Sequence, residues 1–248
     1  MKRYGLIGYP LSHSFSQKYF REKFQREHIA GCQYENFPLA DISEFPVLIQ
    51  QHPDLCGLNV TIPYKEKVIP FLSAQSEVVQ AIGACNCITI ENGLLTGYNT
   101  DVVGFEKSLL PKLQPHHTNA LVLGTGGAAK AVHYVLNKLG IEFIEVSRTP
   151  SGSKKISYEQ VSEAVIKEHQ LIINTSPLGM YPNVNECPQL PYQALTSQHY
   201  LFDLIYNPAK TLFLQKGEER GAAIENGSDM LVIQAEESWR IWNNLKIN

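Results

Sequence analysis

The chain has 248 residues, of which 44% are hydrophobic and 18% are charged, and its formal net charge is -3. These values are typical of a globular protein with one large domain or two modest ones. They exclude the basic excess of a nucleic-acid-binding protein and a disordered acidic tail. No apolar run approaches the roughly 20 residues of a membrane span, and the basic start of the chain reaches Gly8 and Pro10 too soon for a signal peptide. We therefore expect a cytoplasmic protein that binds neither nucleic acid nor membranes.

Along the first hundred residues, predicted strands alternate with predicted helices. Strands are expected at 2–9, 32–37, 55–62, 83–90 and 94–97, and helices at 17–26, 42–50, 65–72 and 77–82. Asn92-Gly93 is a strong hairpin signal between the last two strands. Polar residues gather at strand ends and helix starts, where open α/β sheets bind their ligands: Ser12, Ser14, Asn59, Thr61, Lys65, Asn86 and Asp101.

The first predicted strand ends in a segment rich in hydroxyl groups. Three serines and a histidine follow Pro10, directly before the helix over 17–26. Ser14 or Ser16 can cap that helix. One cap does not need three hydroxyls, so the segment is equally a candidate site for a polyhydroxylated ligand.

Lys65 stands at the start of the helix predicted over 65–72, directly after the strand that carries Asn59 and Thr61. The alternation of that strand places both polar side chains on one face. A positive charge is unfavourable at a helix N-terminus. Lys65 is therefore either a solvated surface side chain or a functional one.

The five cysteines suggest neither a disulfide framework nor a metal site. They are Cys32, Cys56, Cys85, Cys87 and Cys187. Their number is odd, no C-x-x-C occurs, and no histidine stands at metal-ligand spacing beside them. We expect small buried thiols in a reducing compartment and no bound metal.

The second half of the chain contains a variant of the dinucleotide-binding fingerprint. A helix over 105–113 and a linker lead to a strand from residue 119, and then to G-x-G-x-x-A from Gly124 to Ala129. The first glycine of such a turn lets the chain leave the strand sharply, and the second lets the backbone approach a pyrophosphate. The helix over 127–139 then presents unpaired N–H groups to the anion. A glycine-rich turn without a ligand is the alternative interpretation.

The next predicted strand, over 141–146, is followed closely by a positively charged side chain, Arg148. An acidic residue here would bind the 2′-hydroxyl of NAD, whereas this chain has Arg148 between Ser147 and Thr149, with Lys154 and Lys155 shortly after. A cation suits a 2′-phosphate, which favours NADP over NAD. A surface arginine without a ligand is the other possibility.

Two further apolar strands, within 171–180 and 200–208, each end in polar and turn residues, and residues 222–225 lead into a final helix that starts near Asp229. The predicted fold is α/β with two domains. Residues 1–103 plus 229–248 form a mostly parallel α/β substrate domain, and residues 104–228 form a Rossmann-type dinucleotide-binding domain.

Eight motifs, in chain order and over nearly the whole chain, resemble those of the shikimate dehydrogenase family. They are GYPLSHSFS at 8–16, NVTIPYK at 59–65, GACN at 83–86, GYNTD at 97–101, GTGGA at 124–128, SRT at 147–149, NTSPLGM at 174–180 and DLIYNP at 203–208. The sequence departs from the family pattern at Gln17, Phe20-Arg21, Cys87 and Ser147, none of which removes a catalytic group.

The resemblance implies an enzyme that reduces 3-dehydroshikimate to shikimate with NADPH. Hydride transfer needs two rings in contact, so we expect a cleft between the domains that closes on binding. Lys65 and Asp101 would be the catalytic pair, in which Asp101 holds the lysine and favours its charged form. Residues implied to bind the substrate are Ser12, Ser14, Thr61, Asn86, Asp101, Tyr206 and Gln234. Residues implied to bind the cofactor are Glu77, Gly124, Thr125, Gly126, Gly127, Ala128, Ser147, Arg148, Thr149, Leu204, Gly227 and Met230.

The protein is expected to act on its small-molecule substrate as a monomer or a homodimer. Two alternatives remain open. One is a quinate/shikimate dehydrogenase with relaxed cofactor use, against which Arg148 argues. The other is a regulatory domain that binds NADP without turnover, which needs no pair of Lys65 and Asp101.

Overall fold

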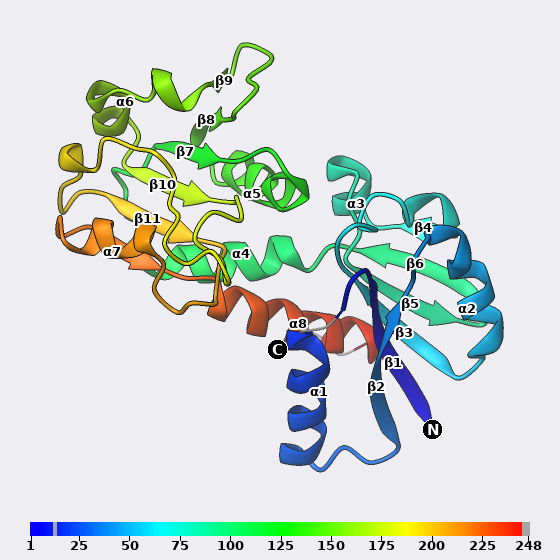
Figure 1. Cartoon of the computed structure of the whole chain (residues 1–248). Helices are drawn as coiled ribbons and strands as arrows, with labels where there is room; N and C mark the ends of the chain where they lie inside the picture. Colours follow the sequence, from blue (N-terminus) through cyan, green and yellow to red (C-terminus); the bar gives the residue numbers. More distant parts are fainter. Residues whose placement is uncertain (12–13, 245–248) are drawn as a thin grey trace. The chain divides into compact units, whose positions relative to one another are not determined.

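The computed structural model describes residues 1–11 and 14–244 and divides the chain into two compact units (Figure 1). Unit 1 consists of Met1–Thr100 together with the chain from Ala235 onward, and unit 2 is Asp101–Gln234. These limits lie three and six residues away from the division predicted at 103/104 and 228/229. The second difference arises because helix α8 (Ser228–Trp242) contributes its first turns to unit 2 and its remainder to unit 1.

Unit 1 contains a six-stranded mixed sheet with the order β2-β1-β3-β5-β6-β4. Its strands are β1 (Lys2–Gly8), β2 (Cys32–Pro38), β3 (Leu55–Val60), β4 (Ala74–Gln75), β5 (Cys87–Glu91) and β6 (Leu94–Tyr98). β1 pairs in parallel with β2 and β3, whereas β5 is antiparallel to both β3 and β6. The predicted hairpin between β5 and β6 is confirmed, since Asn92 and Gly93 both have positive φ angles of 51° and 78°.

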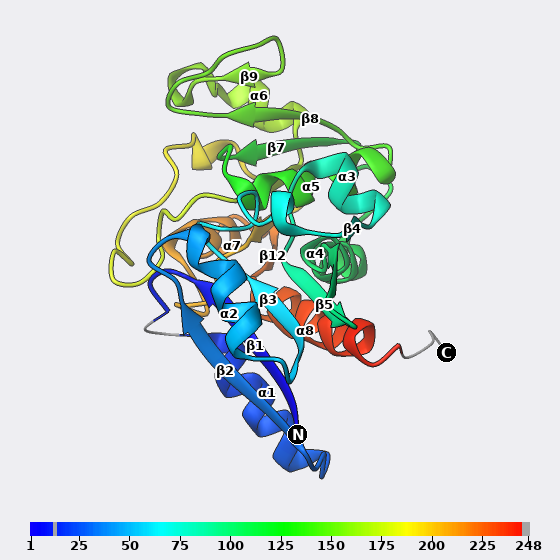
Figure 2. The same ribbon diagram turned by 90° about the vertical axis from the view of Figure 1, so that its right-hand side faces the viewer.

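Helices cover both faces of this sheet. α1 (Phe15–Arg26) and the end of α8 pack on one face, through Phe20, Phe24 and Trp242. α2 (Phe45–Gln51), which follows the 3-10 helix Ile42–Glu44, packs on the opposite face and lies across the central strands in Figure 2. The short helix α3 (Glu77–Ile82) completes the unit.

Trp242 fixes the end of α8 to the sheet. Its indole Nε1 donates to the carbonyl oxygen of Ile88 at 3.0 Å, and its ring stacks on Tyr4 with the centroids 4.9 Å apart. A Cβ at Gly57 of β3 would lie 2.3 Å from Cδ1 of the indole. The helix can approach β3 this closely only because residue 57 is glycine.

Unit 2 contains a six-stranded, fully parallel sheet with the order β12-β11-β10-β7-β8-β9. Its strands are β7 (Asn119–Leu123), β8 (Glu142–Val146), β9 (Lys155–Ile156), β10 (Leu171–Asn174), β11 (Tyr200–Asp203) and β12 (Ala223–Glu225). Counted from β7, this is the doubly wound order 3-2-1-4-5-6, whose direction reverses between β7 and β10. The α/β class predicted from the sequence is confirmed.

The helices of unit 2 are α4 (Asp101–Leu109), α5 (Gly127–Lys138), α6 (Glu163–Glu168) and α7 (Leu212–Glu218), with 3-10 turns at Leu110–Lys112, Tyr158–Gln160 and Tyr192–Ala194. Leu201 packs with Phe213 of α7 on one face of the sheet. The next residue, Phe202, meets Phe105 of α4 edge to face on the other, at 5.1 Å between centroids. Strands buried on both faces explain the nearly continuous apolar runs in the sequence.

Several predicted elements were wrong in extent or kind, among them the strand predicted over 83–90, which begins at Cys87. The helix predicted over 65–72 is a series of turns that ends in the 3-10 helix Ile69–Phe71, because Pro63 and Pro70 leave too few residues for an α-helix between them. The preceding strand ends at Val60 rather than at residue 62. The helix predicted over 105–113 begins earlier, at Asp101, and ends at Leu109, shortly before Pro111.

In the part of the chain that the structure describes, no helix combines the length and the apolar character needed to cross a membrane.

The contact of Gly57 with Trp242 predicts the effect of Gly57→Ala. A Cβ at this position overlaps the indole ring, so we expect the free energy of unfolding to fall by about 1–3 kcal/mol. Urea denaturation measures the change. Gly127→Ala is the control, since a Cβ there meets no atom within 4 Å. Equal stability of the Gly57→Ala variant and the wild type would contradict this account of the packing.

Candidate active site

Several residues predicted for the site in unit 1 lie where β1 and β3 end. The backbone N–H of Thr61 donates to Ile7 O at 2.9 Å, and that of Tyr9 donates to Ile62 O at 3.1 Å. A Cβ at Gly8 would lie 2.4 Å from Cγ2 of Thr61, so a glycine is needed at this contact. The start of the motif that begins at Gly8 therefore meets Thr61 and Ile62 of the motif at 59–65 at one edge of the sheet.

The third motif, at 83–86, joins the same edge because β5 runs antiparallel to β3. The backbone N–H of Val60 donates to Asn86 O at 2.9 Å, and the N–H of Cys85 donates to Lys65 O at 2.7 Å. The second bond holds the backbone of Lys65 beside the segment that carries Asn86. Thr61, Lys65 and Asn86 are thus brought together, although the first and last are 25 positions apart.

Asn86 is buried, and its side chain holds Thr100, the residue directly before Asp101, in place. Its Oδ1 accepts from the backbone N–H of Thr100 at 2.6 Å, and its Nδ2 donates to Thr100 Oγ1 at 3.1 Å. Thr100 directly precedes Asp101, the first residue of α4. A carboxylate in the first turn of a helix interacts favourably with the helix dipole. Asn59, by contrast, is occupied by Tyr34 OH (2.9 Å) and Ser238 Oγ (2.9 Å) inside the unit.

Ser14 is the residue that caps α1. Its Oγ accepts from the backbone N–H of Gln17 at 3.2 Å, which confirms the capping role predicted for one of the serines. The hydroxyl hydrogen of a serine that accepts a bond remains a donor, so the cap is compatible with an anionic ligand. Ser12 lies outside the described residues.

In unit 2, the fingerprint loop follows β7. Gly124 has a φ of 110°, a conformation that favours glycine, and a Cβ there would lie 2.9 Å from Thr175 Oγ1. Gly126 is the N-cap of α5 and has no side chain to cap it. A Cβ at Gly126 would meet no protein atom within 4 Å. Ala129 is buried, which lets the helix lie close to the sheet. The first N–H groups of α5 are therefore available to an anion.

A pocket of about 350 Å³ opens at this loop, a volume in the range of small-molecule sites. It is lined by Gly124, Thr125, Gly126, Val146, Ser147, Arg148, Thr149, Tyr158, Thr175, Ser176, Pro177 and Leu178. Arg148 is exposed at its rim. Lys154 and Lys155 instead pair with Glu142 and Glu145, at 3.1 Å and 2.6 Å. The structure thus separates Arg148 from the two lysines, which the sequence had grouped with it.

Sequence reasoning missed part of this pocket. Tyr158 follows the two-residue strand β9, and no pattern in the sequence marks it. Burial raises the pKa of its phenol, and the charge of Arg148 opposes that shift. Residues 175–178 were part of a recognised motif but had no role assigned. Polar and turn residues directly after the apolar run of β10 were the signal that could have found them.

The other predicted cofactor residues lie outside the lining of this pocket. Leu204 and Gly227 are adjacent, because a Cβ at Gly227 would lie only 2.1 Å from Leu204 O. Met230 is buried against Gly104. Glu77 is the exposed first residue of α3, in unit 1. Of the predicted substrate residues in unit 2, Tyr206 is 39% exposed, whereas Gln234 is buried and donates to Leu231 O at 2.9 Å.

Sequence reasoning also missed a buried carboxylate, Asp203, at the end of β11. Its Oδ1 accepts from Asn174 Nδ2 (3.0 Å) and from the N–H of Ile205 (3.1 Å), and its Oδ2 accepts from Thr211 Oγ1 (2.6 Å). Burial raises the pKa of Asp203 to about 6, and the three hydrogen bonds oppose that shift.

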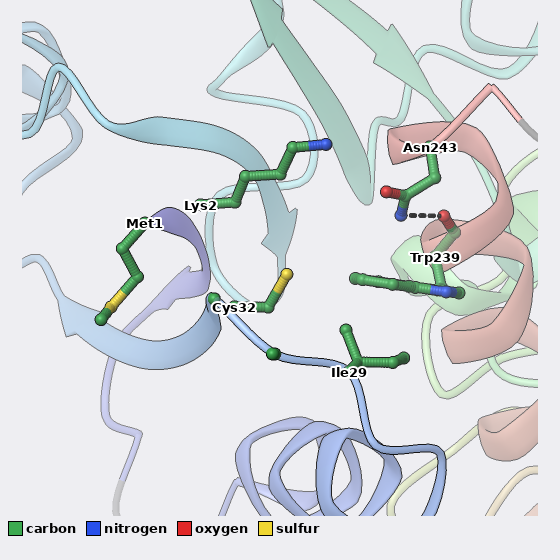
Figure 3. Close-up of a pocket in the computed structure, with 8 residues that line it drawn as sticks. Met1, Lys2, Ile29, Cys32, Trp239 and Asn243 are labelled. Atoms are coloured by element: carbon green, nitrogen blue, oxygen red, sulfur yellow. Dashed lines mark hydrogen bonds between the residues drawn. The ribbon is translucent and has the colours of Figure 1, made fainter.

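Unit 1 also has a hollow of about 460 Å³ that shares no residue with the sites above (Figure 3). Lys2, Ile29, Cys32, Trp239 and Asn243 line it, with Met1, Ala30 and Gly31. It lies at the amino ends of β1 and β2, the edge of the sheet opposite Thr61 and Asn86. Among the described residues, no group of three or more His, Cys, Asp or Glu side chains is arranged to hold a metal ion.

A parallel sheet in this strand order, with a glycine-rich loop and a helix N-terminus at the point where the order reverses, defines the class of α/β dinucleotide-binding proteins. Comparison with known proteins narrows this class. Residues 6–88 match the family model of the shikimate dehydrogenase substrate binding domain.

The chain is 36% identical to the NADP-dependent shikimate dehydrogenase of Caldicellulosiruptor bescii, over 98% of this chain and 89% of that protein. A shikimate dehydrogenase structure from Peptoclostridium difficile is 36% identical, with a TM-score of 0.85, and covers 100% of this chain and 94% of its own. Shikimate 5-dehydrogenase of Thermus thermophilus, solved in complex with NADP(H) and shikimate, is 28% identical, with a TM-score of 0.87 and coverages of 100% and 95%. This chain therefore belongs to the shikimate dehydrogenase family.

The raised pKa of Asp203 predicts a pH dependence of stability. Its ordinary value is 3.8 and its value in the fold is about 6, so the native state holds this proton more tightly than the unfolded chain does. The free energy of unfolding should therefore fall as the pH rises from about 4 to about 6, by about 3 kcal/mol from this group.

Urea denaturation of the wild type and of Asp203→Asn, from pH 4 to pH 7, measures this contribution. The asparagine does not titrate, so the stability of the variant relative to the wild type should rise over this range. Parallel pH profiles of the two proteins would contradict the assignment.

Proposed function

We propose that this chain catalyses the reversible, NADPH-dependent reduction of 3-dehydroshikimate to shikimate, a step of aromatic amino acid biosynthesis. Unit 1 would be the substrate domain and unit 2 the nucleotide domain. The proposed partners are these small molecules alone, and the proposed setting is the cytoplasm, with the chain active as a monomer or a homodimer.

One observation carries the proposal. Thr61, Lys65 and Asn86 converge at a single edge of the unit 1 sheet, and Asn86 holds the residue that precedes Asp101. A cation with hydroxyl and amide groups at this edge, followed in the chain by the carboxylate of Asp101, could bind a polyhydroxylated acid and exchange a proton with it. The full-length relatives named as shikimate dehydrogenases support the same reaction.

The residues present in unit 2 fit NADP. The open space at Gly126 and the uncapped start of α5 suit the pyrophosphate. The exposed guanidinium of Arg148, beside the hydroxyls of Ser147 and Thr149, suits a 2′-phosphate, for which arginine provides paired donors. Thr125, Gly127 and Ala128 would complete the phosphate contacts. Glu77, Leu204, Gly227 and Met230 are proposed to contact the remainder of the nucleotide, with the last three at the nicotinamide.

Reduction of a ketone adds a hydride to carbon and a proton to oxygen. When bound, NADPH supplies the hydride. Lys65 is proposed to give the proton to the C3 oxygen, and to take it back in the reverse direction. An ammonium at this position also stabilises the negative charge that develops on that oxygen. Asp101 is proposed to hold the lysine in position.

The remaining substrate contacts are proposed from the same family resemblance. Ser14, with Ser12, would bind the carboxylate of the substrate, and the capping bond of Ser14 leaves its hydroxyl hydrogen free to donate. Thr61, Asn86, Asp101, Tyr206 and Gln234 would contact the ring and its hydroxyl groups.

One spectrophotometric assay separates this function from its alternatives. NADPH or NADH formation is followed with shikimate or quinate and with each oxidised nucleotide. Turnover of shikimate with NADP supports the proposal, and comparable turnover of quinate or with NAD indicates the relaxed enzyme. Absence of turnover in all four combinations would favour a nucleotide-sensing domain.

Lys65→Ala tests the acid–base role. Removal of the proton donor should lower kcat by about 100- to 10,000-fold. Lys67→Ala, which removes an exposed lysine two positions away, is the matched control and should keep the wild-type rate. A nearly normal kcat in Lys65→Ala would exclude this lysine as the proton donor.

Arg148→Ala tests the nucleotide preference. Loss of a charge-assisted contact with the 2′-phosphate should raise the KM for NADP by about 10-fold or more, and change the KM for NAD much less. Lys154→Ala is the control, since Lys154 is close in sequence but pairs with Glu142. Equal changes of KM for both nucleotides would argue against a 2′-phosphate contact.

A further inference from the structure

The carboxylate of Asp203 lies where the segments that follow the neighbouring strands β10 and β11 meet. It takes no part in the proposed transfer of the proton or the hydride. Asp203 and Asn174 are the last residues of β11 and β10 and are partners in the parallel register. Both are fully buried. A buried carboxylate is costly unless its oxygens are bonded, and here both oxygens accept bonds.

The hydrogen bonds around Asp203 form a network with two branches, and the first branch leads through Asn174 to Ser176 in the nucleotide pocket. Asn174 gives its Nδ2 to Asp203, and its Oδ1 accepts from the backbone N–H of Ser176 (3.0 Å) and from Ser176 Oγ (2.7 Å). The carboxylate accepts only, so it fixes which side of the amide faces Ser176. This orientation holds Ser176 and also Leu178, whose carbonyl oxygen accepts from the same Nδ2 at 3.4 Å, and both residues line the pocket.

The other branch leads to the segment after β11. Asp203 accepts from the N–H of Ile205, and the carbonyl of Ile205 accepts from Gly227 N–H at 3.1 Å. Leu204 N–H donates to Asn174 O at 3.0 Å, so Leu204 lies between the two anchored strand ends. A Cβ at residue 227 would lie 2.1 Å from Leu204 O, so this position has no room for a side chain. Leu204 and Gly227, two of the three residues proposed for the nicotinamide end, are thus fixed by the same carboxylate.

We propose that Asp203 is a positioning residue of the nucleotide site, which sets the loop of residues 175–178 and the segment of Leu204 and Gly227 in their binding geometry. The inference rests on the proposed NADP function of unit 2. It predicts that loss of the carboxylate weakens nucleotide binding rather than substrate binding, because the bonds described above join residues of unit 2.

The test compares variants of the full chain by the Kd for NADP⁺, measured by calorimetric titration, and by the KM for shikimate. Asp203→Ala removes both oxygens. Asp203→Asn keeps one oxygen that accepts from Asn174 and Ile205. His199→Ala is the matched control: His199 is equally buried, bonds to Thr196 N–H and Ile166 O, and stands just before the opposite end of β11.

Asp203→Ala should raise the Kd for NADP⁺ by about 10-fold or more, because buried donors lose their acceptor and the loops relax. Asp203→Asn should stay within about 3-fold of the wild type, and His199→Ala within about 2-fold despite a loss of stability. The KM for shikimate should change by less than about 2-fold in all three.

If Asp203→Ala does not fold, Thr211→Val and Thr211→Ser give the same information. Thr211 donates to the carboxylate but does not line the pocket. The valine variant should weaken NADP⁺ binding and the serine variant should restore it.

Three results would overturn the inference. They are a Kd unchanged in Asp203→Ala, equal effects of Asp203→Ala and His199→Ala, or identical Kd values for the valine and serine variants of Thr211. Failure of the wild-type chain to bind NADP⁺ is a distinct outcome, which would overturn the proposed function and this inference with it.

Discussion

Parallel strand pairing is the constraint on which both candidate sites depend. Strands that run in the same direction end at the same edge of a sheet, so the segments that follow them are gathered there whatever their distance in the sequence. In unit 1 this pairing places the end of β1 beside the end of β3. In unit 2 it places the loop after β7 beside the loop after β10. The antiparallel β5 joins the first group because it begins at that same edge.

Buried polar side chains then fix the segments that the pairing has gathered. Asn86 bonds to Thr100 at the start of α4, and Asp203 bonds to Asn174 and Ile205 at the ends of β10 and β11. Such groups are costly to bury without partners, so each one strongly favours a single local arrangement. Each unit thereby combines an apolar core for stability with one polar junction that defines the geometry of its candidate site.

Much of the fold and of the site was predictable from local patterns. The apolar runs predicted β7, β8, β10 and β11 of unit 2, though not the short β9, and the Asn92-Gly93 turn predicted the hairpin. Ser14, one of the two serines predicted as caps, does cap α1. The helix at Lys65 was wrong, because two prolines outweighed the helical pattern between them. Lys65 therefore does not stand at the start of an α-helix, and the unfavourable interaction with a helix dipole that made it unusual in the sequence is absent. Its backbone is instead placed beside Asn86 in the candidate site by the bond from Cys85 N–H to the Lys65 carbonyl oxygen.

The sequence by itself determined the α/β class, the glycine loop from Gly124 and the cation after the second strand of the nucleotide unit, because each of these is a local signal of turn chemistry or periodicity. Only the tertiary structure decided the partners of the polar groups. It separated Arg148 from Lys154 and Lys155 by pairing both lysines with glutamates of β8, and it joined Asp203 to Asn174 across 29 positions. Those partners depend on which strands pair and in which register, and no local pattern contains that information.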